Sequence, residues 1–151
     1  PLYFIIVDLG ASKDTPTILS SLSRCYPHHS NEICQNVQYY FNTISPQIVQ
    51  EAVTALHQKD AATIGKLMRQ AQSQFDRYIL PACPAQLTAP ALHTLLDHSS
   101  LKPYIWGGKG VGSQGDGTAQ FIVKDEVSSN LAIAIIEQDF PHMTSLKLTI
   151  H

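Results

Sequence analysis

Glycine is unevenly distributed along this chain, and that distribution is the feature that most restricts its fold. Six of the eight glycines among 151 residues fall within residues 107–117. Glycine loses more conformational freedom on folding than any other residue, so such a cluster indicates backbone with positive φ or backbone that approaches another group closely. The flanking residues 103–106 and 118–123 have strand-like sequences. We therefore predict a glycine-rich loop between two strands, and its bare amides, with Lys109 and Asp116, suit an anion such as a phosphate.

The composition is typical of one globular domain. The chain is 44% hydrophobic and 15% charged, which fits a single domain over residues 1–151. The net charge is −2 and the basic residues are scattered, so no nucleic-acid partner is indicated. The longest apolar runs, residues 2–7 and 131–136, are too short to span a bilayer, and we expect no membrane partner. Because the chain enters a strand directly after Pro1, we expect it to be part of a longer protein.

The three cysteines indicate a reducing compartment. Cys25, Cys34 and Cys83 are odd in number and lack CxxC spacing, which argues against a disulfide framework and fits a cytoplasmic location. His28 and His29 lie between the first two cysteines and invite a zinc interpretation, but the spacing matches no standard zinc site. We therefore expect a loop with incidental histidines and cysteines, and no bound metal.

The order of elements predicts the fold. Residues 2–7 form a buried strand, and residues 144–150 a half-buried strand of alternating polarity. Residues 11–29 are rich in Ser, Thr and Pro and predict a loop that could include a short helical turn. Helix starts are indicated at Ser30 or Asn31, at Ser45 before Pro46, at Asp60, within residues 88–97, and at Ser128 or Ser129. Together with the two strands around the glycine loop, this is the β-α-β-β-α-β order of a ferredoxin-like α+β fold with extra helices in the first crossover. We expect a four-stranded antiparallel sheet covered by helices.

Three common phosphate-binding motifs do not account for the glycine loop. Residues 110–115 fit GxGxxG, but the dinucleotide fingerprint requires a helix to begin there, and residues 118–123 are too short and too β-prone for that. A Walker A loop requires Gly-Lys-Ser/Thr at its end, and no lysine separates Gly112 from Ser113. A protein-kinase glycine loop is accompanied by HRD and DFG segments, which this sequence lacks.

Residues 107–118, Gly-Gly-Lys-Gly-Val-Gly-Ser-Gln-Gly-Asp-Gly-Thr, resemble the third motif of the GHMP kinases. This superfamily includes galactokinase, homoserine kinase, mevalonate kinase and phosphomevalonate kinase, and its pattern is Gly-Ala-Lys-x-x-Gly-Ala-Gly-Gly-Gly-Gly-Cys before an apolar strand. The helices before the motif and the helix and strand after it are also similar to the C-terminal domain of these enzymes. The resemblance implies that residues 1–151 are that domain. The phosphate-binding loop and the catalytic base would then belong to an N-terminal domain outside these residues.

The same resemblance implies a function for the intact protein. It would use ATP and Mg²⁺ to phosphorylate a hydroxyl of a sugar or mevalonate-like metabolite, and the isolated chain would be inactive. Residues 8–15 resemble the Asp-x-Gly-x-x-Lys/Arg-x-Thr segment of mevalonate-kinase-like members, which implies a catalytic role for Thr15 and a substrate-binding role for Lys13. Cofactor-binding roles are implied for Lys109, Gly112, Ser113, Gln114, Gly115, Asp116 and Gly117.

Simpler structural roles stand beside these implied ones. The glycines could form a flexible hairpin, although a hairpin needs only one or two. Lys109 could be a solvated lysine at a strand end, Asp116 could stabilise a turn rather than bind a metal, and Thr15 could cap a helix. Gln114 and Asp116 stand where the family pattern has glycine, so the loop must tolerate side chains there. The histidines at 93, 98 and 142 have no partner recognisable in the sequence, and we expect them at the surface.

A second hypothesis is a free-standing ligand-binding or regulatory module. Ferredoxin-like domains host many functions, so the fold alone does not select between a kinase domain and a binding module. Under either hypothesis a homodimer could form through apolar surface that a partner domain would otherwise cover.

Overall fold

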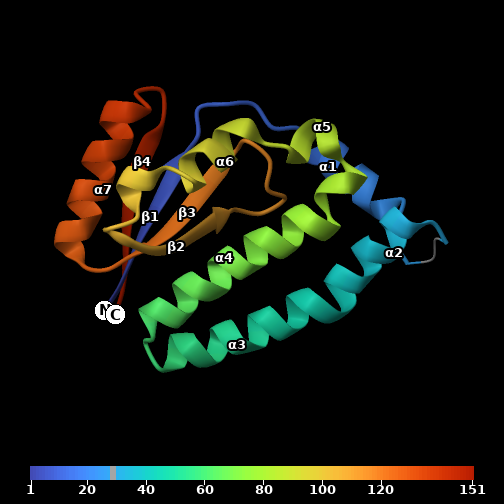
Figure 1. Ribbon diagram of the computed structural model, residues 1–151, viewed down its shortest axis with the longest axis horizontal. Coiled ribbons are helices and arrows are strands. Elements are labelled where there is room, and N and C mark those ends of the chain that lie inside the picture. Colours follow the sequence, from blue (N-terminus) through green and yellow to red (C-terminus); the bar gives the residue numbers. More distant parts are fainter. Residues whose placement is uncertain (28–29) are drawn as a thin grey trace.

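One four-stranded antiparallel sheet organises the computed structural model, which describes residues 1–27 and 30–151 (Figure 1). Its strands are β1 (Leu2–Asp8), β2 (Ile105–Gly110), β3 (Thr118–Val123) and β4 (Thr144–Ile150). They lie in the order β2-β3-β1-β4, and every neighbouring pair is antiparallel. This is the strand order of the split β-α-β-β-α-β fold, so the predicted α+β class is confirmed.

The first crossover, from β1 to β2, holds most of the helices. The helices are α1 (Thr15–Ser23), α2 (Glu32–Tyr39), α3 (Ser45–His57), α4 (Ala61–Tyr78), α5 (Pro84–Leu87), α6 (Pro90–Leu96) and α7 (Glu126–Asp139). Three shorter helical segments are the π-helical turn Tyr40–Ile44 and the 3₁₀ turns Leu80–Ala82 and Ser99–Leu101. A bilayer-spanning helix, long and apolar throughout, does not occur among the described residues.

Two of the predicted helix caps are confirmed and one is wrong. Asn31 accepts a hydrogen bond from the amide of Cys34 at 2.8 Å, and Asp60 accepts one from the amide of Thr63 at 3.0 Å, as side-chain caps do. Helix α7 begins earlier than predicted, because Asp125 in extended conformation caps it by accepting from the amide of Ser128 at 2.7 Å. Ser128 and Ser129 are therefore buried inside the helix rather than at its start.

Residues 11–29, predicted as a loop that could include a short helical turn, contain the nine-residue helix α1. Asp14 caps it by accepting from the amide of Thr17 at 3.0 Å, and Pro16 occupies the first turn, where a missing N–H leaves no bond unmade. The hydrogen bonds that Thr17 donates, from its side chain and then its amide, lower the pKa of the Asp14 carboxyl. The Ser, Thr and Pro content that predicted a loop is therefore the content of a capped first turn.

Helix α3 begins at Ser45, as predicted, but the capping role predicted for Ser45 is wrong. The chain continues from α2 through the π-helical turn into α3, and the amide of Ser45 donates to the carbonyl of Tyr40, five residues back. Pro46 has no N–H, and its ring would crowd the carbonyl of Asn42 in a regular α-helix. The widened π-helical turn accommodates the proline without ending the helix.

The cysteine prediction is corrected as well. Cys25 and Cys34 form a disulfide that joins the end of α1 to the start of α2, whereas Cys83 is free and buried. The two paired residues are separated by nine positions in sequence, but their Cα atoms lie 4.5 Å apart. Spacing alone did not predict this approach. His28 and His29, which entered the zinc interpretation, lie outside the described residues.

The core lies on both faces of the sheet. Ile5 and Val7 of β1 and Phe121 of β3 pack with α6 and α7 on one face, while Leu2 and Ile122 pack with α3 and α4 on the other (Figure 1). A third cluster joins α1, α2 and α4 at the end of the sheet where the glycine loop lies; it includes Ile18, Val37 and Phe75.

Strand β4 is more exposed than predicted. It forms one edge of the sheet, and its apolar residues Leu146, Leu148 and Ile150 are 65%, 46% and 43% exposed. Leu148 lies opposite Phe4 and Ile150 opposite Leu2, so their side chains share the face that α3 and α4 cover farther along the sheet. The sheet therefore carries an uncovered apolar stripe at this edge.

Candidate phosphate-binding loop

The glycine cluster divides into a strand and a loop. Strands β2 and β3 pair from Ile105 opposite Val123 to Gly110 opposite Ala119, with a register shift near Trp106. The connecting loop is therefore residues 111–117, and the strand predicted over residues 103–106 lies later, at residues 105–110. The two segments form a hairpin, as predicted, but half of the cluster is strand.

The strand glycines allow helix α4 to contact the edge of the sheet. A Cβ added at Gly107 would lie 2.0 Å from the carbonyl oxygen of Gly65, and one added at Gly65 would lie 2.5 Å from the carbonyl carbon of Trp106. A Cβ at Gly108 would lie 2.4 Å from the ring of Phe121. Close packing therefore explains these glycines without any ligand.

The loop glycines have a different role, because the backbone there turns through positive φ. Gly112 has a φ of 63°, Gln114 of 68° and Gly115 of 72°. Gln114, which stands where the family pattern has glycine, adopts the left-handed conformation and is only 4% exposed. Its side-chain oxygen fills the space above Gly110, where an added Cβ would lie 2.4 Å from it.

The tip of the loop faces solvent. Gly112 is exposed, and a Cβ built on it would have no heavy atom within 4 Å. Within residues 1–27 and 30–151, no hydrogen bond is donated by the amides of Gly112 and Ser113. Two neighbouring amides at an open turn are the donor arrangement that binds an anion.

The segment after β1 lies against this loop, as its similarity to a family motif implies. Lys13 Nζ donates to the carbonyl of Val111 at 3.5 Å, and the hydroxyls of Thr15 and Ser113 are 3.3 Å apart. The amide of Leu9 donates to the carbonyl of Gly117 at 3.0 Å. The structure thus brings the two predicted site segments together, although 98 positions separate Thr15 from Ser113 in sequence.

The inner side of the loop packs against the same segment. A Cβ at Gly117 would lie 2.9 Å from Cδ of Lys13, and one at Gly115 would lie 3.4 Å from Ile18. The methylene chain of Lys13 therefore lies across the loop, and Thr15 is the first residue of α1.

Lys109 belongs to strand β2 rather than to the loop. Its ammonium group donates to the carbonyl of Gly110 at 2.5 Å, and burial lowers the pKa of this lysine. It lines a cavity of about 440 Å³ between α3, α4 and the sheet, together with Gly112 and Gln114. The rest of the lining is mainly apolar and includes Phe4, Ile48, Leu67, Met68 and Phe75.

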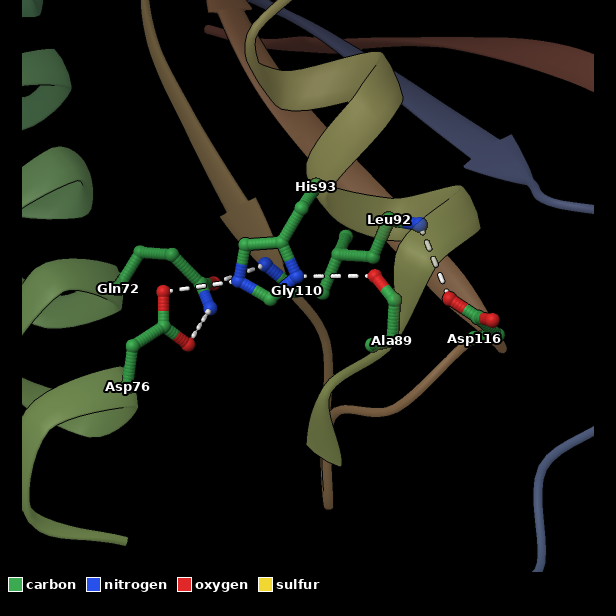
Figure 2. Close-up of polar contacts among 7 residues, drawn as sticks. All are labelled: Gln72, Asp76, Ala89, Leu92, His93, Gly110 and Asp116. Atoms are coloured by element: carbon green, nitrogen blue, oxygen red, sulfur yellow. Dashed lines mark hydrogen bonds and ion pairs between the residues drawn. The ribbon is translucent and has the colours of Figure 1, made fainter. Parts of the chain in front are cut away.

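Asp116 points away from the tip. Its Oδ1 accepts a hydrogen bond from the amide of Leu92 at 3.0 Å, in the first turn of α6 (Figure 2). The residue before α6, Ala89, has a φ of 42° and no side chain that could cap the helix. Asp116 thus supplies a helix cap from another segment, a role that differs from both the turn and the metal-ligand roles considered above.

Comparison with known proteins shows that this fold has been seen before. No family model matches the sequence, and no curated protein sequence matches it. Solved structures do. A mevalonate kinase from L. major, in complex with R-mevalonate, superposes with a TM-score of 0.67 at 15% identity over 98% of this chain and 42% of that one.

Two other kinases agree with that result. Lactococcus lactis galactokinase complexed with galactose has a TM-score of 0.67 at 12% identity over 99% of this chain and 45% of that one. Streptococcus pneumoniae phosphomevalonate kinase has a TM-score of 0.67 at 13% identity over 99% of this chain and 40% of that one. All three are GHMP-family kinases. The chain has the fold of a GHMP-kinase C-terminal domain. It spans less than half the length of these kinases.

Within this GHMP C-terminal fold, three polar residues were missed by sequence reasoning. Gln72 and Asp76 of α4 and His93 of α6 form a hydrogen-bonded chain that ends on the amide of Gly110 (Figure 2). His93 is therefore paired rather than a solitary surface residue, and His98 is likewise paired, with Asp139 at 2.7 Å. The spacing of Gln72 and Asp76, one helical turn apart on α4, was the only local signal.

Proposed function

We propose that this chain is the C-terminal domain of an ATP-dependent GHMP-type kinase, which transfers the γ-phosphoryl group to a hydroxyl of a sugar or mevalonate-like metabolite. The observation that carries the proposal is the open turn at Gly112 and Ser113, whose amides donate to no described residue and which lies beside Lys13 and Thr15. A fold shared with three small-molecule kinases supports it.

The residues around the turn fit the demands of phosphoryl transfer, which depends mainly on positioning and on stabilising spread negative charge. The amides of Gly112 and Ser113 would donate to phosphate oxygens, and Lys13 would supply a positive charge beside the substrate. The Thr15 hydroxyl would contact the transferred phosphoryl group. ATP with Mg²⁺ would supply that group when bound.

The residues present fit the nucleotide better than the metal. Asp116 accepts a hydrogen bond from Leu92, so its carboxylate is directed away from the turn. Among residues 1–27 and 30–151, no group of three or more His, Cys, Asp or Glu side chains could hold a metal ion. In the proposal, Mg²⁺ would be held outside this chain, which would contribute the amides of Gly112 and Ser113 and the lysine at position 13.

The proposal requires a partner domain from the same polypeptide. The kinases of this fold are more than twice as long as the chain, which covers 40–45% of the first three. The exposed stripe of Leu146, Leu148 and Ile150 is the kind of apolar surface that a neighbouring domain covers. We expect the parent gene to encode, before Pro1, a domain with the family's Gly-Leu-x-Ser-Ser phosphate-binding loop. An unrelated upstream segment would overturn the assignment.

The direct test uses the parent protein with both domains. Phosphorylation of a panel of sugars and mevalonate-like alcohols is followed by ATP consumption in the presence of Mg²⁺. We expect Thr15→Val and Lys13→Met to lower kcat/KM by roughly tenfold or more, since each removes one transition-state contact. Lys66→Met, at an exposed position on α4, is the matched control and leaves kcat/KM unchanged. Equal losses in Lys13→Met and Lys66→Met would contradict the assigned role.

A free-standing ligand-binding module remains the second candidate, and the apolar cavity of about 440 Å³ favours it. This alternative predicts that the 151-residue chain alone binds a nucleotide or metabolite in calorimetry, and that apolar substitutions within the cavity weaken binding. The kinase proposal predicts activity only when both domains are joined. Sedimentation of the isolated chain tests whether the β4 stripe then forms a homodimer.

The proposal also implies a cytoplasmic protein, because ATP is available there. The Cys25–Cys34 disulfide is the feature that opposes this location, since cytosolic thiols are usually reduced. Counting free thiols in protein purified under alkylating conditions decides the point: three free thiols agree with the cytoplasm, and one indicates an oxidising compartment.

A further inference from the structure

A continuous chain of hydrogen bonds connects helix α6 to the start of the glycine loop. His93 Nε2 is 2.8 Å from Oδ2 of Asp76, and the other carboxylate oxygen accepts from Gln72 Nε2 at 2.9 Å. Gln72 Oε1 in turn accepts from the amide of Gly110 at 2.8 Å (Figure 2). Gln72 is only 7% exposed, and both ends of its carboxamide are used. The last strand residue before the loop is thus held by a side chain of α4.

The two neighbours of the His93 ring define its protonation state. His93 Nδ1 is 2.8 Å from the carbonyl oxygen of Ala89, which can only accept, and Nε2 faces a carboxylate, which also accepts. Both ring nitrogens therefore donate when the ring is an imidazolium. Burial by itself would lower the pKa of His93, but the hydrogen bonds to Asp76 and Ala89 and the charge of Asp76 outweigh it and raise that pKa.

The same helix also holds the far end of the loop. The amide of Leu92, next to His93 in α6, donates to Asp116 at 3.0 Å. Gly110 is linked to His93 through the side chains of Gln72 and Asp76, and Asp116 bonds directly to Leu92 (Figure 2). Both ends of the loop are therefore held by neighbouring residues of α6. The exposed turn at Gly112 and Ser113 lies between these two ties.

We propose that Gln72, Asp76 and His93 are positioning residues for the glycine loop, and that deprotonation of His93 loosens Gly110 and the turn that follows it. The inference deepens the proposed function, on which its catalytic consequence rests. His93 would act through Asp76 and Gln72, and none of the three would touch the substrate. Loss of the His93 proton would weaken phosphate binding at the turn of Gly112 and Ser113.

Other charged groups surround His93 in the same cavity of about 600 Å³. Arg69 on α4, Asp97 at the end of α6 and Lys102 after the following 3₁₀ turn line it together with His93 and Asp76. The Arg69 guanidinium donates to the carbonyl of Trp106, so α4 holds strand β2 at two points, Trp106 and Gly110. Lys109, the ionisable residue of β2, lines the other cavity, between α3, α4 and the sheet. Asp76 is therefore the charged partner in direct contact with the ring.

The test follows the backbone amide of Gly110 in the 151-residue chain by ¹⁵N–¹H NMR between pH 5 and pH 9. We expect the amide shifts of Gly110 and Gly112 to titrate with the same midpoint as the His93 ring. His93→Gln and Asp76→Asn should abolish this titration. They should also raise the exchange rate of the Gly110 amide roughly tenfold, the effect of losing one well-placed hydrogen bond.

His98→Gln is the matched control, because His98 forms a similar pair with Asp139 at 2.7 Å but has no described link to the loop. The Gly110 titration should persist in this variant. A Gly110 shift that is independent of pH, or one that still titrates in His93→Gln, overturns the inference. If His93→Gln does not fold, Gln72→Glu, which keeps an acceptor for Gly110 and places a second carboxylate beside Asp76, should move the midpoint upward, and an unmoved midpoint also overturns it.

A second measurement separates this inference from the proposed function. Addition of inorganic triphosphate to the chain should shift the Gly112 and Ser113 amides, more strongly at pH 6 than at pH 8.5 in the wild type and equally in His93→Gln. A Gly110 titration without any triphosphate response would preserve the positioning role and remove the phosphate-binding role. A triphosphate response with the same pH dependence in His93→Gln would preserve the phosphate-binding role of the turn and remove the positioning role of His93.

Discussion

The glycines of strand β2 and those of the following loop occupy one continuous run of sequence, yet glycine is required at the two places for different reasons. At Gly107 and Gly108 the space for a side chain is taken by Gly65 and Phe121. At Gly112 the space is empty, but φ is 63°, a conformation that other residues adopt only with strain. The first group lets a helix approach a sheet edge, and the second lets a chain reverse with its amides facing outward.

This difference explains how an exposed loop can be held in one conformation. Helix α4 packs on β2 through the contact of Gly65 with Gly107. Arg69 also donates to the carbonyl of Trp106, and Gln72 accepts from the amide of Gly110, so the strand that enters the loop is fixed. Asp116 fixes the residue near the loop exit by capping α6. The turn between them can remain open to solvent, because its ends are determined by the packed part of the molecule. Rigid support for an open site is what preorganised binding requires.

The largest effect is expected where a strand glycine gains a side chain. In Gly107→Ala the new Cβ would lie 2.0 Å from the carbonyl oxygen of Gly65. Because that carbonyl is backbone and cannot rotate aside, α4 must move away from the sheet. We expect a loss of about 3 kcal/mol or more in the free energy of unfolding, at the upper end of overpacking effects. Urea denaturation measures it. A loss below about 0.5 kcal/mol would remove close packing as the reason for this glycine.

Asp116→Ala should have the next largest effect, because it leaves the amide of Leu92 without its cap. We expect a loss of about 1–2 kcal/mol, as for other N-cap deletions. Asp116→Asn is the control, since its side-chain oxygen can still accept and most of the stability should remain. If both variants lose equal stability, the loss comes from the carboxylate charge rather than from the hydrogen bond that caps α6. The Asp116 end of the loop would then be held by charge, unlike the Gly110 end.

Gly112→Ala tests the loop side of the comparison. The added methyl group would contact nothing, so the cost is limited to the left-handed backbone conformation, about 1 kcal/mol. Gly112→Asn should lose less, because asparagine tolerates this conformation better. Urea denaturation of both variants beside Gly107→Ala checks the ranking. If Gly112→Ala costs as much as Gly107→Ala, the distinction between packing glycines and turn glycines is wrong.

The sequence predicted the elements whose determinants are local. Asp60 and Asn31 cap helices as their positions indicate, and the apolar run of residues 2–7 forms strand β1. The fold class followed from the order of these elements. The same local rules did not predict the π-helical turn that joins α2 to α3 before Pro46, nor the full length of α1, whose first turn contains Pro16.

The candidate site was only partly predictable, because its key contacts join distant segments. The proximity of Thr15 to Ser113 was implied by resemblance and is seen in the structure. The two kinds of glycine could not be separated in sequence, since the distinction depends on Gly65, more than forty positions earlier. The links from Asp116 to Leu92 and from His93 to Asp76 likewise depend on tertiary packing.

The smallest stability effect should be a pH dependence carried by His93. Its folded pKa is raised above the ordinary value of 6.5, so the stability it contributes is fully present below about pH 6.5 and is lost as the pH rises through the folded pKa. Because the side chains of His93 and Asp76 are each 29% exposed, solvent screening limits the contribution to about 1 kcal/mol or less.

Urea denaturation from pH 5.5 to pH 8.5 measures this effect as a difference between variants. Wild type should lose stability relative to His93→Gln as the pH rises, because only the wild type has a proton to lose in the Asp76 pair. Lys66→Met, at an exposed position on α4, should keep the wild-type slope between pH 6.5 and pH 8.5. If instead His93→Gln keeps that slope, the near end of the loop is held by the glycine contacts of α4 alone. In that case the His93–Asp76 pair does not stabilise the Gly110 end of the loop, whereas the Asp116 end depends on a charged side chain that caps α6.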